Sequence, residues 1–262
     1  MTDTTADGRI PRRAVLGWAA AGASSVLAGC DASAPKAAPA PVRSTPPGAA
    51  AHTTPPAPAP PGPAREIARG PGTRQQVALT FHGAGEPALA EKVLAALDKG
   101  GAQVTILAVG TWLAANPALA RRITAAGHDL GNHTYSHLTM PGLAEPEARR
   151  EIERCRDLLA RLTGSPGRWF RPSGTQFSTP LIRRLAGAAG YPVCLSYDVD
   201  PRDYQDPGAA AVRSRTAAGV RPGSIVSLHL GHPGTAAALP GIVADLRARG
   251  LTAVTVTDLL AP

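Results

Sequence analysis

The sequence is poor in lysine, in acidic residues and in cysteine. Its net charge of +8 comes from 27 basic and 19 acidic residues, and lysine is found only at Lys36, Lys92 and Lys99. The arginines are scattered rather than gathered in a block, and no nucleic-acid-binding motif is present, so we expect no nucleic-acid partner. The charge reflects either arginine-rich codon usage in a GC-rich genome or attraction to an anionic envelope surface. Cys155 and Cys194 fall on a predicted helix and a predicted strand, and we expect free thiols there rather than a disulfide.

The chain also lacks an apolar run long enough for an ordinary spanning helix. The apolar stretch 14–28 would extend about 22 Å as a helix, against a hydrocarbon core of about 30 Å. This length favours the hydrophobic region of an export signal. The stretch ends in Leu27-Ala28-Gly29-Cys30, which resembles a bacterial lipobox with Cys30 as the lipidated residue. Arg12-Arg13 resembles a twin-arginine signal, with Sec export as the alternative. We expect residues 1–29 to be a signal peptide and the protein to be exported and lipid-anchored to the outer face of the cell membrane.

Proline is abundant but unevenly distributed. Eleven of the 27 prolines lie between Asp31 and Ala64, in a tract too poor in apolar residues to fold. Proline fixes φ and favours extended polyproline II structure, so residues 30–64 are predicted to be a disordered, semi-rigid stalk reaching up to about 100 Å. A ligand for proline-binding modules is the alternative. Residues 65–262 then form one domain.

In this domain, strand-like and helix-like patterns alternate. Strands are predicted at Val77–Phe81, Val104–Val109, Val193–Tyr197, Ile225–Leu230 and Ala253–Val256, with a short segment at Asp129–Asn132. Helices are predicted at Glu145–Leu162, from Ser178 to before Gly190, and from Ala236 to Arg249. This alternation predicts an α/β fold with a parallel sheet, whose functional residues follow the carboxyl ends of the strands.

Clusters of polar residues occur at those strand ends. They are residues 81–86, 133–137, 171–174, 198–203 and 229–232, and they contain or adjoin five of the seven histidines. His133 and His137 have the i, i+4 spacing that would place both imidazoles on one face of a helical turn. Two imidazoles so placed could share a Zn²⁺-type ion.

The segment 127–137, which reads Gly-His-Asp-Leu-Gly-Asn-His-Thr-Tyr-Ser-His, resembles the metal-binding segment of the polysaccharide deacetylase family with its NodB homology domain. The resemblance implies a distorted (β/α) barrel of the NodB type that removes N- or O-acetyl groups from carbohydrates with a divalent metal ion. It implies that His133 and His137 are metal ligands and that Arg171 positions the catalytic base. It further implies that Asp203 orients His229, the general acid.

The first motif departs from the family. Family members normally read Thr-Phe-Asp-Asp, where the first aspartate is the base and the second is a metal ligand; this chain has His82 and Gly83 at those positions. His82 could replace the base or a ligand, and the alternation of side chains along a strand favours the base. Glu86 is then the candidate third ligand.

These observations predict a metal-dependent hydrolase, with zinc as the favoured ion. Its substrate would be an acetylated polysaccharide, with peptidoglycan favoured because the tether would face the cell wall. Backbone N–H groups near Gly174 would contact the substrate, as would Tyr204, which stands where tryptophan is common in the family. Aromatic residues make up only 4% of the chain, which favours a shallow or short binding site. The alternative is a catalytically impaired domain that serves as a glycan-binding envelope lipoprotein.

Overall fold

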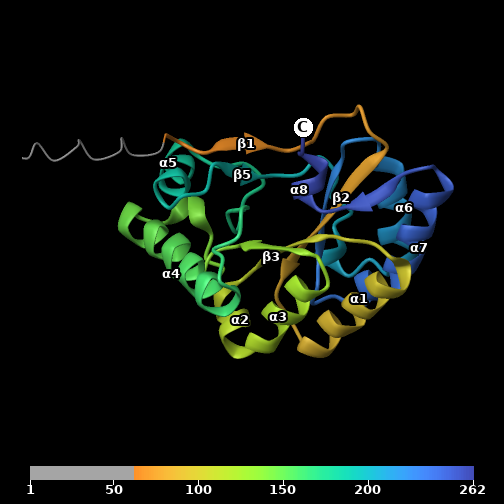
Figure 1. Ribbon diagram of the computed structural model, residues 1–262, viewed down its shortest axis with the longest axis horizontal. Helices are drawn as coiled ribbons and strands as arrows, with labels where there is room; N and C mark the ends of the chain where they lie inside the picture. Colours follow the sequence, from red (N-terminus) through yellow and green to blue (C-terminus); the bar gives the residue numbers. More distant parts are fainter. Residues whose placement is uncertain (1–61) are drawn as a thin grey trace, which may run out of the picture. The chain divides into compact units, whose positions relative to one another are not determined.

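A computed structural model describes residues 62–262 (Figure 1). The expected signal peptide, Cys30 and nearly all of the expected stalk lie outside the described residues. In the part of the chain that is described, no helix is both long enough and apolar enough to cross a membrane.

The larger sheet is built around β2 (Gln76–Gly83). This strand pairs in parallel with β3 (Thr105–Ala108) on one side and with β6 (Ile225–His229) on the other. Farther out, β4 (Asp129–Asn132) pairs with β3, while β7 (Thr252–Val254) pairs with the first residues of β2. Because helices cover the sheet, most of β2 is a continuous buried run, as is typical of a central parallel strand.

A smaller parallel pair, β1 (Arg65–Ile67) and β5 (Val193–Leu195), extends this arrangement. Single bridges link β4 to Phe170, Phe170 to β5, and Val199 to β6. The strands and bridges together close an irregular ring. The predicted α/β fold, a distorted barrel of the NodB type, is thereby confirmed.

Helices surround the strands (Figure 1). They are α1 (Pro87–Gly100), α2 (Gly110–Ala115), α3 (Pro117–Ala125), α4 (Glu145–Thr163), α5 (Pro180–Ala188), α6 (Ala209–Gly219), α7 (Pro233–Ala248) and α8 (Val256–Leu259), with 3-10 turns η1 (Met140–Gly142) and η2 (Asp203–Gln205). The three helices with the clearest sequence patterns correspond to α4, α5 and α7.

Local sequence explains where two of these helices end or begin. Gly164 follows α4 at φ 77°, a left-handed conformation that glycine adopts without strain. The Thr179 side chain accepts a hydrogen bond from the Ile182 N–H and so caps α5. Cys155 and Cys194 are buried free thiols, as predicted. Sequence patterns missed β1, since Arg65–Ile67 has neither the length nor the apolar character of a core strand.

Candidate active site

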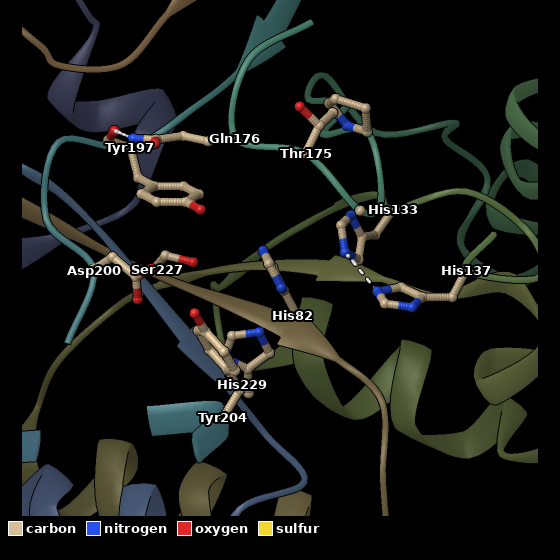
Figure 2. A pocket seen from close by; sticks show the side chains of 12 residues that line it. His82, His133, His137, Thr175, Gln176, Tyr197, Asp200, Tyr204, Ser227 and His229 are labelled. Carbon is tan, nitrogen blue, oxygen red and sulfur yellow. Dashed lines mark hydrogen bonds between the residues drawn. The ribbon is translucent and has the colours of Figure 1, made fainter. Parts of the chain in front are cut away.

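A pocket of about 360 Å³ opens at the carboxyl ends of the strands (Figure 2). It is lined by His82, His133, His137, Pro172, Gly174, Thr175, Gln176, Tyr197, Asp200, Tyr204, Ser227 and His229. All five polar clusters of the sequence contribute to the pocket or to the groups directly behind it. The parallel sheet therefore gathers residues that lie far apart in the chain, as predicted.

His133 and His137 do lie together, but the predicted helical turn is wrong. They belong to the loop after β4, in which Thr134 and His137 have left-handed φ values of 67° and 59°. The loop is held by Asn132, whose Oδ1 accepts the Thr134 N–H at 2.8 Å. The His133 and His137 Nε2 atoms lie 3.2 Å apart. Short-range hydrogen bonds, rather than helical periodicity, thus bring the two imidazoles together.

Hydrogen bonding fixes the tautomers of this pair. His133 Nδ1–H donates to the Arg171 carbonyl oxygen at 2.9 Å, which leaves the His133 Nε2 lone pair free. The His137 Nε2–H then donates to that lone pair. Burial lowers the pKa of both imidazoles, and that of His133 falls well below its ordinary value. Both side chains are therefore neutral at neutral pH.

His82 lies at the centre of the pocket, between His133 and His229 (Figure 2). Its ring stacks on His133 with centroids 4.2 Å apart and meets the His229 ring edge-on at 4.4 Å. Burial, followed by the neighbouring His133 and Arg171, lowers the pKa of His82 well below its ordinary value. His82 faces the pocket while Gly83 faces Ile106 and Ala108, so the alternation inferred from the strand pattern is confirmed.

Arg171 is fully buried beneath His82, and within residues 62–262 all of its hydrogen-bond acceptors are uncharged groups. Its Nη1 donates to His82 Nε2 at 3.1 Å, and its Nη2 donates to Thr80 Oγ1 at 3.0 Å. The carbonyl oxygens of Leu195 and Ser196 accept two further hydrogen bonds. Burial lowers the pKa of Arg171 to about 10, so the guanidinium remains charged at neutral pH. Arg171 thus holds the side chain of residue 82 in place, and its implied role of positioning a catalytic base stays a prediction.

His229 and Asp203 form the pair that the resemblance implied. His229 Nδ1–H donates to Asp203 Oδ1 at 2.7 Å, so Nε2 is the nitrogen left for other partners. The buried Asp203 also accepts the His229 backbone N–H at 2.7 Å and the Thr235 hydroxyl at 2.6 Å. Tyr204 lies at the rim, 46% exposed, with its ring 5.4 Å from that of His229.

The described residues do not supply a complete donor set for a metal ion. The expected third ligand, Glu86, is an exposed residue at the start of α1 and does not line the pocket. Within residues 62–262, no three His, Cys, Asp or Glu side chains are grouped so that they could hold a metal ion. Catalytic zinc sites use three protein ligands and one open position. The histidine pair therefore does not fit the zinc centre that the resemblance implied, and Glu86 does not complete it.

Gly174 lines the pocket with φ 71°, and a Cβ there would lie 2.8 Å from Thr139 Cα, so the position requires glycine.

Ser227 and Tyr197 also line the pocket, although neither is among the residues predicted from the sequence. Ser227 stands two residues before His229 on β6, and strand alternation would have placed it on the same face. A second pair, His232 and Asp206 at 2.9 Å, lies outside the pocket lining, with its imidazole 5.7 Å from that of His229.

The barrel and its histidine-lined pocket define a class of carbohydrate-modifying hydrolase, and comparison with known proteins agrees. Residues 69–194 match the family described as polysaccharide deacetylase. A peptidoglycan-N-acetylglucosamine deacetylase of Bacillus cereus is 30% identical over 194 residues, covering 72% of this chain and 90% of that protein. A chitooligosaccharide deacetylase of Bradyrhizobium is 32% identical over 171 residues, covering 62% and 73%.

Solved structures add a second kind of relative. A CE4 family pseudoenzyme from Bacillus anthracis superposes with a TM-score of 0.71 at 26% identity, covering 76% of this chain and 70% of that one. A mutant of that pseudoenzyme with restored enzymatic activity has a TM-score of 0.71 at 27% identity, covering 76% and 72%. The chain belongs to the polysaccharide deacetylase family, whose enzymes are hydrolases acting on non-peptide carbon–nitrogen bonds.

Proposed function

We propose that this domain removes acetyl groups from a cell-envelope carbohydrate, with the N-acetyl sugars of peptidoglycan as the favoured substrate. The observation that carries this proposal is the His229–Asp203 pair, bonded at 2.7 Å, beside His82 in one open pocket. Such a pair positions a proton carrier at the bond to be broken. His229 Nε2 would deliver a proton to the amine that leaves when the acetyl group is cleaved.

The walls of the pocket suit a short carbohydrate segment. The side chains of Thr175, Gln176 and Ser227 offer hydrogen-bonding groups for sugar hydroxyls, and Tyr204 offers an exposed ring at the rim. A volume of about 360 Å³ accommodates one or two sugar units. This size agrees with the short site expected from the low aromatic content.

The choice of substrate rests on similarity and on the expected tether. The Bacillus cereus relative is named for peptidoglycan N-acetylglucosamine, and this chain covers 90% of its length. We further propose that residues 1–29 direct export and that lipidation of Cys30 anchors the protein at the outer face of the cell membrane. The domain would then work on the wall polymer nearest the membrane.

A second candidate function is the binding of an acetylated glycan without turnover. It is supported by the loss of both first-motif carboxylates, by the incomplete set of metal donors, and by similarity to a pseudoenzyme. The two candidates share a ligand and differ in whether acetate is released.

The test is acetate release from N-acetylglucosamine oligomers and from purified peptidoglycan, with calorimetric binding measured in parallel. The wild type should release acetate, and His229→Ala should lose release while retaining binding. Lys92→Ala changes an exposed residue on α1, outside the pocket, and is the control for effects of mutation and purification that do not involve the site. Binding without acetate release by the wild type would favour the second candidate, and absence of both would overturn the two together.

A further inference from the structure

We infer that His82 is a hydrogen-bond donor to the acetyl carbonyl oxygen, presented through Nδ1–H, and that this donor takes the place of a metal ion, for which residues 62–262 do not offer a complete donor set. This assignment rests on the proposed function and deepens it. It differs from both roles that the sequence suggested for His82, general base and metal ligand. Three features of the pocket support it.

The first feature is the tautomer of His82. A guanidinium has only N–H donors, so His82 Nε2, 3.1 Å from Arg171 Nη1, must accept the hydrogen bond. A neutral imidazole that accepts at one nitrogen carries its proton on the other, and His82 therefore carries a proton on Nδ1. A proton on Nε2 would set two N–H groups against each other beside a buried positive charge.

The second feature is that the Nδ1–H faces open space. Among the described residues, the His82 side chain makes one hydrogen bond, from Arg171 to its Nε2. His82 Nδ1 has no hydrogen-bond partner there. In residues 62–262, the buried side-chain polar atoms without a partner belong to Gln76, His128, Ser178 and Arg183. His82 Nδ1 is not one of them, so this unpaired nitrogen is accessible rather than buried. Since His82 lines the pocket, its free donor is available to a ligand there.

The third feature is the charge behind the ring. Arg171 is a buried cation whose four hydrogen-bond acceptors are all uncharged. A cation that donates to one imidazole nitrogen withdraws electron density through the ring and strengthens the opposite N–H as a donor. Fixed donors aimed at a developing oxyanion, a neutral imidazole among them, are an established way of stabilising it.

With His82 in this role, His229 supplies both proton transfers. Nε2 of His229, whose Nδ1–H is bonded to Asp203, takes a proton from water as the water oxygen bonds to the acetyl carbon. The resulting oxyanion accepts a hydrogen bond from the His82 Nδ1–H, which keeps its proton. The carbon–nitrogen bond then breaks as His229 Nε2–H returns the proton to the leaving nitrogen, which gives acetic acid and an amine; proton transfer between these two products gives acetate and an ammonium group. Asp203 holds the imidazolium formed between the two steps.

A matched pair of substitutions separates a donor from a base. His82→Gln preserves an acceptor for Arg171 and a donor toward the pocket, whereas His82→Glu, of the same length, preserves the acceptor and has no donor. In chelator-treated protein the Gln variant should stay within about tenfold of wild-type kcat, and the Glu variant should fall about 100- to 1000-fold, the loss typical of removing one oxyanion donor. Lys92→Ala should match the wild type.

The alternatives give opposite results. A general base at position 82 would leave the Glu variant active and the Gln variant inactive, which would overturn the assignment. Loss of acetate release on chelation, with recovery on adding zinc, would overturn it while leaving the proposed function standing. No release by any variant under any condition would overturn the proposed function itself.

The tautomer can be tested without turnover. Long-range ¹H–¹⁵N spectra of the full chain distinguish protonated from unprotonated ring nitrogens, and His82→Gln assigns the His82 signals by their disappearance. We expect protonated Nδ1 and unprotonated Nε2 at neutral pH, with the Nδ1 signal shifting when an N-acetylglucosamine oligomer is added. A proton on Nε2, or a charged ring, would overturn the assignment whatever the activity.

Discussion

The two sides of the pocket are built around opposite charges. On the β6 side, the buried Asp203 carboxylate receives three hydrogen bonds, two of them from His229. On the β2 side, the buried Arg171 guanidinium is bonded to neutral groups, including His82. The β6 side retains Asp203, the aspartate of the family pattern. The β2 side has His82 and Gly83 where the family pattern has two aspartates. In the proposed mechanism, this difference suits His229, bonded to an anion, to carrying a proton, and His82, bonded to a cation, to donating a hydrogen bond.

The largest expected effect comes from removing the anion. Asp203→Asn keeps the shape of the side chain but would turn the His229 imidazole toward its other tautomer, so Nε2 could no longer accept a proton. We expect kcat for acetate release to fall about 1,000- to 10,000-fold. Thermal unfolding measured by circular dichroism should show that the variant is folded. A loss below tenfold would break the contrast between the two sides.

Removing the cation should act mainly on stability. Arg171→Met leaves the Leu195 and Ser196 carbonyl oxygens and His82 Nε2 without their donor inside the barrel. We expect the free energy of unfolding to fall by about 2–4 kcal/mol, as for other buried networks that lose one member. Urea denaturation measures this change. An unchanged midpoint would show that the β2 side does not depend on its cation.

Restoring a carboxylate at the lost ligand position should not rebuild a metal site. A Cβ at Gly83 would lie 3.0 Å from Ala108 Cα and 3.1 Å from Ile106 Cγ2, on the face of β2 away from the pocket. Gly83→Asp should therefore cost about 1–3 kcal/mol of stability from overpacking and leave zinc affinity unchanged.

Gly83→Ala is the matched control, because it adds the crowded Cβ without the charge. Comparable losses in both variants are expected by urea denaturation, with zinc affinity followed by calorimetry. Tight zinc binding by Gly83→Asp at wild-type stability would show that the β2 side can be converted back to the family pattern.

The smallest expected effect is on the response to acid. Burial lowers the pKa of His82, His133 and His137 below the ordinary value of 6.5. Below pH 6.5 the unfolded chain binds protons that the folded chain does not, so stability is complete above that pH and is lost as the pH falls. Urea denaturation between pH 5 and 8 should show this slope, and His137→Gln should reduce it. A stability that rises on acidification would contradict it.

Sequence patterns predicted the fold and most of the pocket because both depend on local regularities. Alternation placed His82 on the pocket face, and strand ends gathered His229 and Asp203. The patterns failed where distant contacts decide the outcome. His133 and His137 meet in a loop held by Asn132. Glu86 lies outside the pocket because α1 begins directly after it, which its spacing from His82 does not indicate. The tautomer of His82 depends on Arg171, 89 residues away, which no spacing rule could reveal.

The pairing of β2 with β6 has a consequence for the size of the reacting group. His82 and His229 are register partners on adjacent parallel strands, so the backbone ladder sets the gap between their rings. The distance between the two backbones is the spacing of neighbouring strands in a sheet, about 4.8 Å. Movement of the surrounding loops would not widen this gap, because both side chains are carried by paired strands. A one-residue slip of β2 would turn His82 to the opposite face of the sheet and so take its imidazole out of the pocket.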